Sequence, residues 1–240
     1  MFVGLLETVG RLRGSWPPIY IRVRRPISYT PFSHPDLRHA EFWELGHKLF
    51  RSTPASFPVT FIPGNALTDA HLAEHPVLPT SPSPTVPAPL PDLRTLTSLN
   101  PLAGRLTAIY CGALFHLFPA EGQARLARAL AGLLAPVRGA TIAGLHSAGR
   151  DGTEGVHAVM RGNGGEGGDS DNVITQYWHS PRTWTALWDG EIFPQGTVRV
   201  QIELVEHAKE IAQISALTGV EIGKEWVADS HTLRWSVTRV

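Results

Sequence analysis

The sequence LTAIYC at 106–111 opens the part of the chain that decides the fold. This apolar run is rich in β-forming residues and follows a turn signal at Gly104. Leucines then recur at helical spacing between Pro119 and Pro136, and the sequence ATIAGL at 140–145 predicts a second buried strand. Strand, helix and strand in this order predict a right-handed βαβ crossover and a parallel sheet.

Three further strands are predicted outward from this crossover. The sequence VTFI at 59–62 is β-rich and stops at a Pro-Gly pair, while 198–204 alternates apolar and polar residues as a half-exposed strand does. The run 233–237 predicts a terminal strand, and 206–217 predicts a helix before it. The fold class is therefore α/β, a Rossmann-like sheet with helices on both faces, whose closing two strands we expect to be antiparallel.

The composition indicates a soluble globular protein of one ordinary domain. The chain has 240 residues, 42% of them hydrophobic and 18% charged. Lys+Arg and Asp+Glu both total 21, so no electrostatic footprint for nucleic acid or an acidic membrane stands out. Cys111 is the only cysteine, which excludes a disulfide framework and a four-cysteine zinc site. Without a signal-peptide n-region or a membrane-length apolar run, we expect a cytoplasmic location.

Two biased stretches interrupt the globular pattern. Seven of the sixteen residues at 76–91 are proline, which predicts an extended surface loop, and five of the seven residues at 162–168 are glycine. The apolar segments around them are too short to form separate cores. We therefore expect an atypical N-terminal segment at 1–35 and one domain at 36–240 that carries both stretches as loop insertions.

A series of motifs follows in a fixed order from residue 36 onward. They are DLR at 36–38, EFWELGHKLFR at 41–51, TFIPGNAL at 60–67, ALFHLF at 113–118, LLAP at 133–136, GLH at 144–146, HSP at 179–181 and WSVTR at 235–239. This series resembles the fungal class I S-adenosylmethionine (SAM) methyltransferases of secondary metabolism, the group that includes the meroterpenoid (austinol-type) O-methyltransferases. The resemblance implies SAM as cofactor, a terpenoid or polyketide-like acceptor with a hydroxyl or carboxyl group, and a homodimer.

The resemblance places the cofactor against two short segments. Asp36, followed by Leu37, stands where the family has the acid that accepts hydrogen bonds from the ribose hydroxyls; a helix N-cap is the alternative. Asn65, followed by Ala66, stands where the family has an aspartate for the adenine amino group. An asparagine oxygen accepts without the charge-assisted part, so we expect weakened adenine recognition. A plain Gly-Asn turn is the alternative.

The acceptor side is expected near the end of the 106–111 strand. His116 follows that strand at the rim where open α/β sheets bind ligands, so His116 and His179 are candidate bases, with a structural histidine as the alternative. Trp178, Trp184 and Trp188 are concentrated enough to line an apolar acceptor pocket; a place in the core is their alternative.

One required feature of the family is missing ahead of Asp36. The family has a first strand and a Gly-rich turn about 20 residues before that acid, whereas 10–18 contains no G-x-G and no strand-like run. The run 14–21 leads instead into the family's second strand, so we expect the first strand to be lost or replaced and SAM binding to be impaired. Three outcomes are open: Phe2–Leu6 substitutes for the strand, the sheet closes differently, or the chain is unstable alone.

Two other functions compete with a methyltransferase. The sequence HLAEH at 71–75 fits the inverted zinc-peptidase pattern, in which His71 and His75 bind one metal and Glu74 is the base, but Pro76 ends any helix there. The bland alternative is an exposed polar turn, and we expect no metal. The other competing function is that of a non-catalytic partner for an intact homologue.

Overall fold

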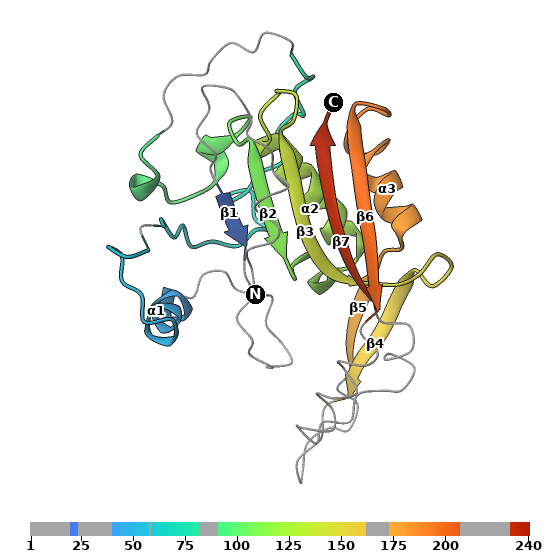
Figure 1. Cartoon of the computed structure of the whole chain (residues 1–240), viewed down its shortest axis with the longest axis horizontal. Helices are drawn as coiled ribbons and strands as arrows, with labels where there is room; N and C mark the ends of the chain where they lie inside the picture. Colours follow the sequence, from blue (N-terminus) through green and yellow to red (C-terminus); the bar gives the residue numbers. More distant parts are fainter. Residues whose placement is uncertain (1–19, 24–39, 58, 82–90, 162–172, 207–230) are drawn as a thin grey trace.

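The structure is a computed structural model, and it describes residues 20–23, 40–57, 59–81, 91–161, 173–206 and 231–240. These residues form one five-stranded mixed sheet, a separate two-stranded hairpin and three α-helices (Figure 1). The predicted α/β class is confirmed.

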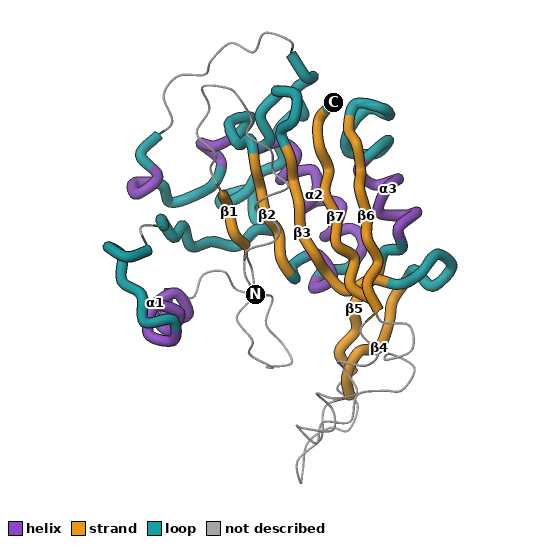
Figure 2. Tube along the Cα trace, viewed as in Figure 1, coloured by secondary structure: helices purple, strands orange, loops and turns teal. Residues whose placement is uncertain are grey.

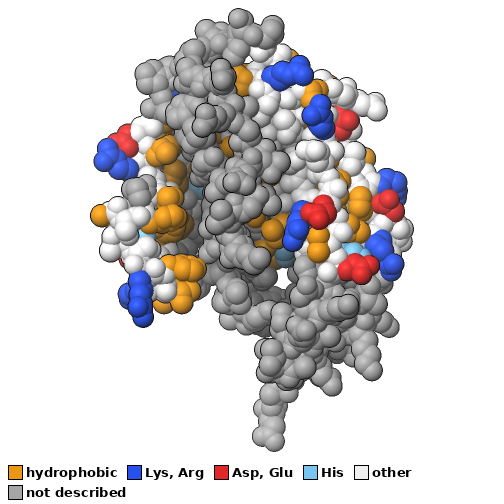
Figure 3. Space-filling model, in the orientation of Figure 1, with side chains coloured by type: hydrophobic (Ala, Val, Ile, Leu, Met, Phe, Trp, Pro, Cys, Tyr) orange, Lys and Arg blue, Asp and Glu red, His pale blue; other side chains and the backbone are white. Residues whose placement is uncertain are grey.

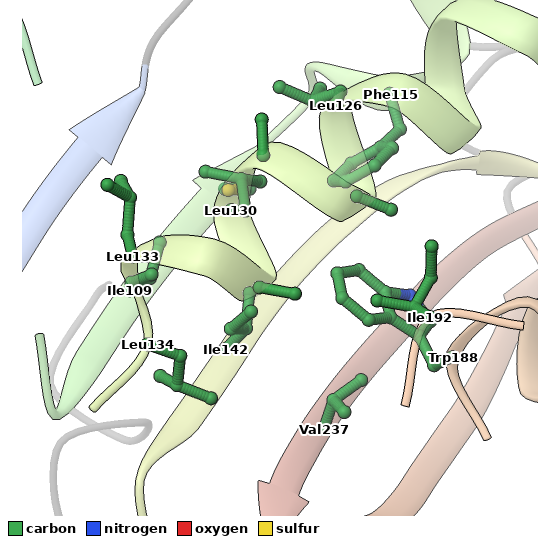
Figure 4. Close-up of a cluster of buried hydrophobic side chains, with 14 of the residues drawn as sticks. Ile109, Phe115, Leu126, Leu130, Leu133, Leu134, Ile142, Trp188, Ile192 and Val237 are labelled. Atoms are coloured by element: carbon green, nitrogen blue, oxygen red, sulfur yellow. The ribbon is translucent and has the colours of Figure 1, made fainter. Parts of the chain in front are cut away.

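The predicted crossover is present. Strand β2 (Ala108–Gly112) leads through helix α2 (Ala120–Leu133) into strand β3 (Thr141–Ala148), and β2 and β3 are parallel. The helix starts after Pro119, whose fixed φ suits a helix start, and its leucines lie on the face turned to the sheet. Figure 4 shows Leu130 of α2 above Ile142 of β3, in a core that includes Trp188 and Val237.

The closing two strands are antiparallel, as predicted. Strand β6 (Val198–Glu206) pairs with strand β7 (His231–Arg239), and β7 also pairs with β3, so the sheet order is β1-β2-β3-β7-β6. Arg199, Gln201 and Glu203 are exposed on β6, which confirms a half-exposed strand. The predicted helix at 206–217 lies outside the described residues, apart from Glu206, which ends β6.

Strand β2 has a partner on the side where the first strand was expected to be lost or replaced. Strand β1 (Tyr20–Val23) pairs with β2 in parallel, with Ile21 opposite Ile109. In a doubly wound sheet the first strand lies beside the fourth, which is the position that β1 takes relative to the crossover. The run at 14–21 therefore leads into a strand at the first position rather than the second, and Phe2–Leu6 lies outside the described residues.

Helices α2 and α3 (Pro181–Trp188) cover the same face of the sheet (Figures 1 and 2). Alternate residues of β3 and β7, such as Ile142 and Val237, are buried on that face. On the opposite face of β6 and β7 the described residues are polar apart from Val205, and Arg234 pairs with Glu203 at 3.3 Å. Among the described helices, the covering of the main sheet is thus one-sided, and not two-sided as predicted.

The hairpin of β4 (Gly155–Arg161) and β5 (Val173–Trp178) stands apart from the main sheet and leads into α3. Ser180 caps α3 in a reciprocal capping box with Thr183. The glycine-rich stretch at 162–168 falls between these two strands in the sequence and lies outside the described residues.

The segment before the crossover is irregular. It holds α1 (Ala40–Leu49) and the short turns η1 (Leu93–Thr95) and η2 (Asn100–Leu102). The strand predicted at 59–62 is wrong, because this run is extended backbone with no partner strand among the described residues. Residues 76–81 of the proline-rich stretch are without regular structure, as expected. Among the helices that the structure describes, none is long and apolar enough to cross a bilayer.

Candidate functional site

The parallel strands end together at one edge of the sheet, at Val23, Gly112 and Ala148. Ligands of open α/β sheets bind outside the carboxyl ends of the strands, where neighbouring connections run in opposite directions. Directly after β2 the chain turns at Ala113, whose φ of 53° lies in the left-handed region that favours glycine. Such a residue costs about 1 kcal/mol, so the surrounding packing holds the turn in place.

Three buried histidines meet at this edge, and we call them the histidine group: His116, His146 and His179. They come from the turn η3 (Phe115–Leu117), from β3 and from the link between β5 and α3. Backbone contacts bring the segments together, since Ser147 donates its N–H to Nδ1 of His116 at 3.3 Å and Gly149 donates to the carbonyl of His179 at 3.1 Å.

Each of the other two histidines is oriented by one neighbour. Trp235 donates its indole N–H to Nδ1 of His146 at 3.0 Å. Nδ1 of His179 lies 3.1 Å from the hydroxyl of Thr183. Nε2 of His146 and Nε2 of His179 have no hydrogen-bond partner among the described residues.

Burial disfavours the charged form of His146 and of His179. It lowers the pKa of His146 well below the usual value, with smaller contributions from His116 and His179. Burial also lowers the pKa of His179 to about 4, against a smaller opposing effect of Glu154. A base with so low a pKa removes protons poorly at neutral pH, so His179 is suited to hydrogen bonding and orientation more than to proton abstraction.

The predicted tryptophans are part of the core. Trp178, Trp184 and Trp188 are each 0% exposed. Trp184 packs edge-on against Phe115 at 4.9 Å and against His146 at 4.5 Å between ring centroids, while Trp188 stacks on Trp235 at 5.6 Å. Trp184 also packs against His179, at 5.2 Å between ring centroids, and the three buried tryptophans offer no open wall to a ligand in this structure.

A shallow groove of about 440 Å³ runs beside the histidine group, between the first turns of α2 and α3. His179 and Thr183 line it together with the exposed residues Glu121, Arg182 and Glu191. Ala120, Ala124, Ala186 and Leu187 complete its lining. The groove is the nearest open space to the histidine group among the described cavities.

The predicted cofactor residues are only partly described. Asp36 and Leu37 lie outside the described residues. Asn65 accepts a hydrogen bond from the N–H of Leu67 at 2.9 Å through its side-chain oxygen, so it forms a turn of its own. Ala66 is buried, and its carbonyl accepts from the guanidinium of Arg125 on α2 at 3.1 Å.

The residues of the peptidase-like pattern are arranged for structure. Residues 71–75 form a turn and extended backbone, not a helix. Glu74 accepts from Arg128 at 2.7 Å, and the ring of His71 lies directly over Gly64. The described residues contain no group of three side chains able to hold a metal ion.

Sequence reasoning missed two members of the site, His146 and Trp235. Both lie in motifs of the family resemblance and both occupy inward positions of strands. A histidine at an inward strand position is an available signal, because a buried polar side chain needs a partner. Its partner is 89 residues away in the sequence, which no local pattern reveals.

No protein-family model matches this sequence, and no curated protein does. Among solved structures, an S-adenosylmethionine-dependent methyltransferase from Mesorhizobium loti matches at 15% identity with a TM-score of 0.32, over 57% of this chain and 64% of that one. Two structures of Haemonchus contortus phosphoethanolamine N-methyltransferase 2, with S-adenosylhomocysteine or S-adenosylmethionine bound, match at 8% and 10% identity with TM-scores of 0.29, over 57% of this chain and 34% of theirs. The chain thus covers less than two thirds of each of these proteins. This is a distant structural resemblance to SAM-dependent methyltransferases, too low to carry an argument about activity.

Proposed function

We propose that this chain is a methyltransferase-like protein that binds SAM weakly and acts in O-methylation of a small terpenoid or polyketide-like metabolite. One observation carries the proposal. Three motifs of the family resemblance, at 113–118, 144–146 and 179–181, each supply one member of the histidine group at the carboxyl-end edge. Histidines 30 to 63 positions apart in the sequence are brought to the edge where sheets of this kind bind ligands.

The fit to SAM is incomplete at the methionine end. In the family a glycine-rich turn follows the first strand, but after β1 the next glycine in the sequence is Gly46. In this sequence every residue between β1 and Gly46 carries a side chain, and a side chain at these positions keeps a backbone from approaching a ligand closely. When bound, SAM supplies the reactive methyl group, and the protein supplies alignment. For this chain we derive no catalytic step through the cofactor.

At the adenine end the fit is better, because Asn65 retains an amide able to donate and accept. Its oxygen already accepts from Leu67, and an oxygen of this kind has two lone pairs. On the acceptor side, the groove between α2 and α3 offers space beside neutral His179, which is suited to hydrogen-bond a hydroxyl.

Titration calorimetry with SAM and S-adenosylhomocysteine tests the proposal. We expect a dissociation constant of about 0.1–1 mM for the natural chain. Asn65→Asp is expected to tighten SAM binding about fivefold, because it restores a charge-assisted hydrogen bond to adenine. Thr68→Asp is the control, since it puts the same charge into the same exposed turn without touching adenine.

The outcomes separate two claims. Low-micromolar SAM binding by the natural chain would overturn the impairment while supporting the cofactor. Absence of binding at millimolar SAM in both the natural chain and Asn65→Asp would overturn the cofactor itself.

A second function, as a partner protein, is favoured by the surface of α1 and the loop after it. Leu45, Leu49, Phe50, Phe57 and Val59 are between 45% and 74% exposed, and Figure 3 shows hydrophobic side chains gathered on that side of the molecule. Exposed apolar side chains in such number are typical of interaction surfaces. Size-exclusion chromatography of the chain alone and with a full-length homologue distinguishes a homodimer from a mixed complex.

A further inference from the structure

Arg239 lies at the edge of the sheet opposite the histidine group, where β7 ends (Figure 1). Arg239 is only 2% exposed, although its guanidinium is always charged at physiological pH. The ring of Phe193 lies 4.9 Å from the guanidinium carbon and fixes its plane. Burial of a charge without a counter-charge is strongly unfavourable, so the surroundings of Arg239 need an explanation.

Only one corner of this guanidinium is satisfied. Nη1 donates to the carbonyl of Leu78 at 2.8 Å. Nε and Nη2 have no hydrogen-bond partner among the described residues, which also offer Arg239 no carboxylate within ion-pair distance. Burial accordingly lowers the pKa of Arg239, with no negative group to oppose the effect.

The two unsatisfied nitrogens form one edge of the guanidinium, and other arginines of this chain show what that edge does. Arg94 uses Nε and Nη2 to hold both carboxylate oxygens of Asp92, at 3.0 and 2.8 Å. Arg128 uses the same pair on the carboxylate of Glu74, at 2.7 and 3.4 Å. In Arg239 the same fork is buried and pre-oriented.

A second unsatisfied polar group lies on the loop that holds Nη1. The side-chain oxygen of Thr80 is buried and has no partner among the described residues, and Thr80 is two residues beyond Leu78 in the sequence. This loop is at the surface, since Leu78 is 47% exposed.

We infer that the Nε–Nη2 edge of Arg239, beside the loop that carries Thr80, forms a binding site for an oxyanion with two oxygens on one centre. A phosphate and a carboxylate share this chemistry, because both present two acceptors at the spacing of the guanidinium fork. The site is distinct from the proposed methyltransferase site, at the other edge of the sheet, and does not depend on it.

Thermal unfolding of the full chain with sodium phosphate, sodium acetate or sodium chloride, at equal ionic strength, tests the site. Phosphate or acetate is expected to raise the unfolding temperature over chloride by about 3 °C for each tenfold rise in concentration above the dissociation constant. Arg239→Met is expected to abolish this rise, and Thr80→Val to reduce it. Arg234→Met is the control, because this half-exposed arginine lies on the same strand and pairs with Glu203.

The anion that raises the unfolding temperature identifies the class of ligand, either a phosphate or a carboxylate. An equal rise in the natural chain and in Arg239→Met would overturn the site, as would equal unfolding temperatures of the natural chain in all three salts. If Arg239→Met folds poorly, Arg239→Lys keeps the charge and loses the fork. A full oxyanion response of that variant would also overturn the proposal.

Discussion

The crossover at 106–148 and the segment at 40–81 are both rich in apolar residues, yet they fold differently. In the crossover, Leu130, Leu133 and Ile142 are 0% exposed and lie between a helix and a sheet. In the earlier segment, Leu49 and Phe50 are 74% and 66% exposed, and the backbone after α1 follows turns and irregular loops. The difference teaches that an apolar run becomes a strand when a neighbouring strand satisfies its backbone, and that β-rich composition alone does not suffice.

The largest expected effect breaks the crossover itself. At Gly144 of β3 an added Cβ would lie 2.8 Å from Trp235 and much closer to the backbone oxygen of Cys111 on β2. Neither neighbour is the end of a flexible side chain, so Gly144→Ala requires two strands to separate. We expect a loss of about 4 kcal/mol in the free energy of unfolding, at the upper end for an overpacked core.

Urea denaturation measures this loss, and Ala143→Ser on the neighbouring, half-buried position of the same strand is the control. A loss below about 1 kcal/mol for Gly144→Ala would contradict the close pairing of β2 and β3 at this point.

The crossover was predictable because its signals are local. Pro119 and Pro136 bound a helical repeat of leucines, and the strands on each side are continuous apolar runs. The irregular structure of 59–62 was not predictable, because an apolar run forms a strand only beside a partner. Among the described strands, none pairs with this run. The place of β1 depends on a pairing with residues 88 positions away. The histidine group is similar: its members were visible in motifs, but their meeting depends on the tertiary fold.

The second effect concerns acid stability, and it arises from a histidine packed against the crossover. The pKa of His179 is about 4 in the folded protein, below the value of about 6.5 in the unfolded chain. The unfolded state therefore binds the extra proton between these values, and stability falls as the pH drops from 6.5 towards 4. We expect this histidine to contribute about 3 kcal/mol to that fall.

Urea denaturation at a series of pH values measures this fall in the free energy of unfolding, with His179→Gln as the comparison. The variant is expected to lose less stability than the natural chain between pH 6.5 and 4. Parallel pH profiles of the two proteins would show that His179 is accessible to protons in the folded state.

The third effect lies in the irregular segment and mirrors the first. At Gly64 an added Cβ would meet the ring of His71, which is a side chain and not the backbone of a paired strand. We expect Gly64→Ala to cost about 1 kcal/mol, much less than Gly144→Ala. Urea denaturation of both variants under one set of conditions tests the contrast. Equal losses would mean that the segment around Gly64 is packed as rigidly as the crossover.

The smallest effect is expected where apolar side chains are open to water. Leu49→Ser removes a side chain that is 74% exposed, so the free energy of unfolding should change by less than about 0.5 kcal/mol. Leu133→Ser, on the buried face of α2, is the opposite case and should be severely destabilising. The measurement for Leu49→Ser is made at several protein concentrations. A larger loss that grows with concentration would mean that a second copy covers α1 in solution, because only an assembled state gains stability by mass action. The exposed face of α1 would then be buried by a partner as the crossover is buried by its own sheet.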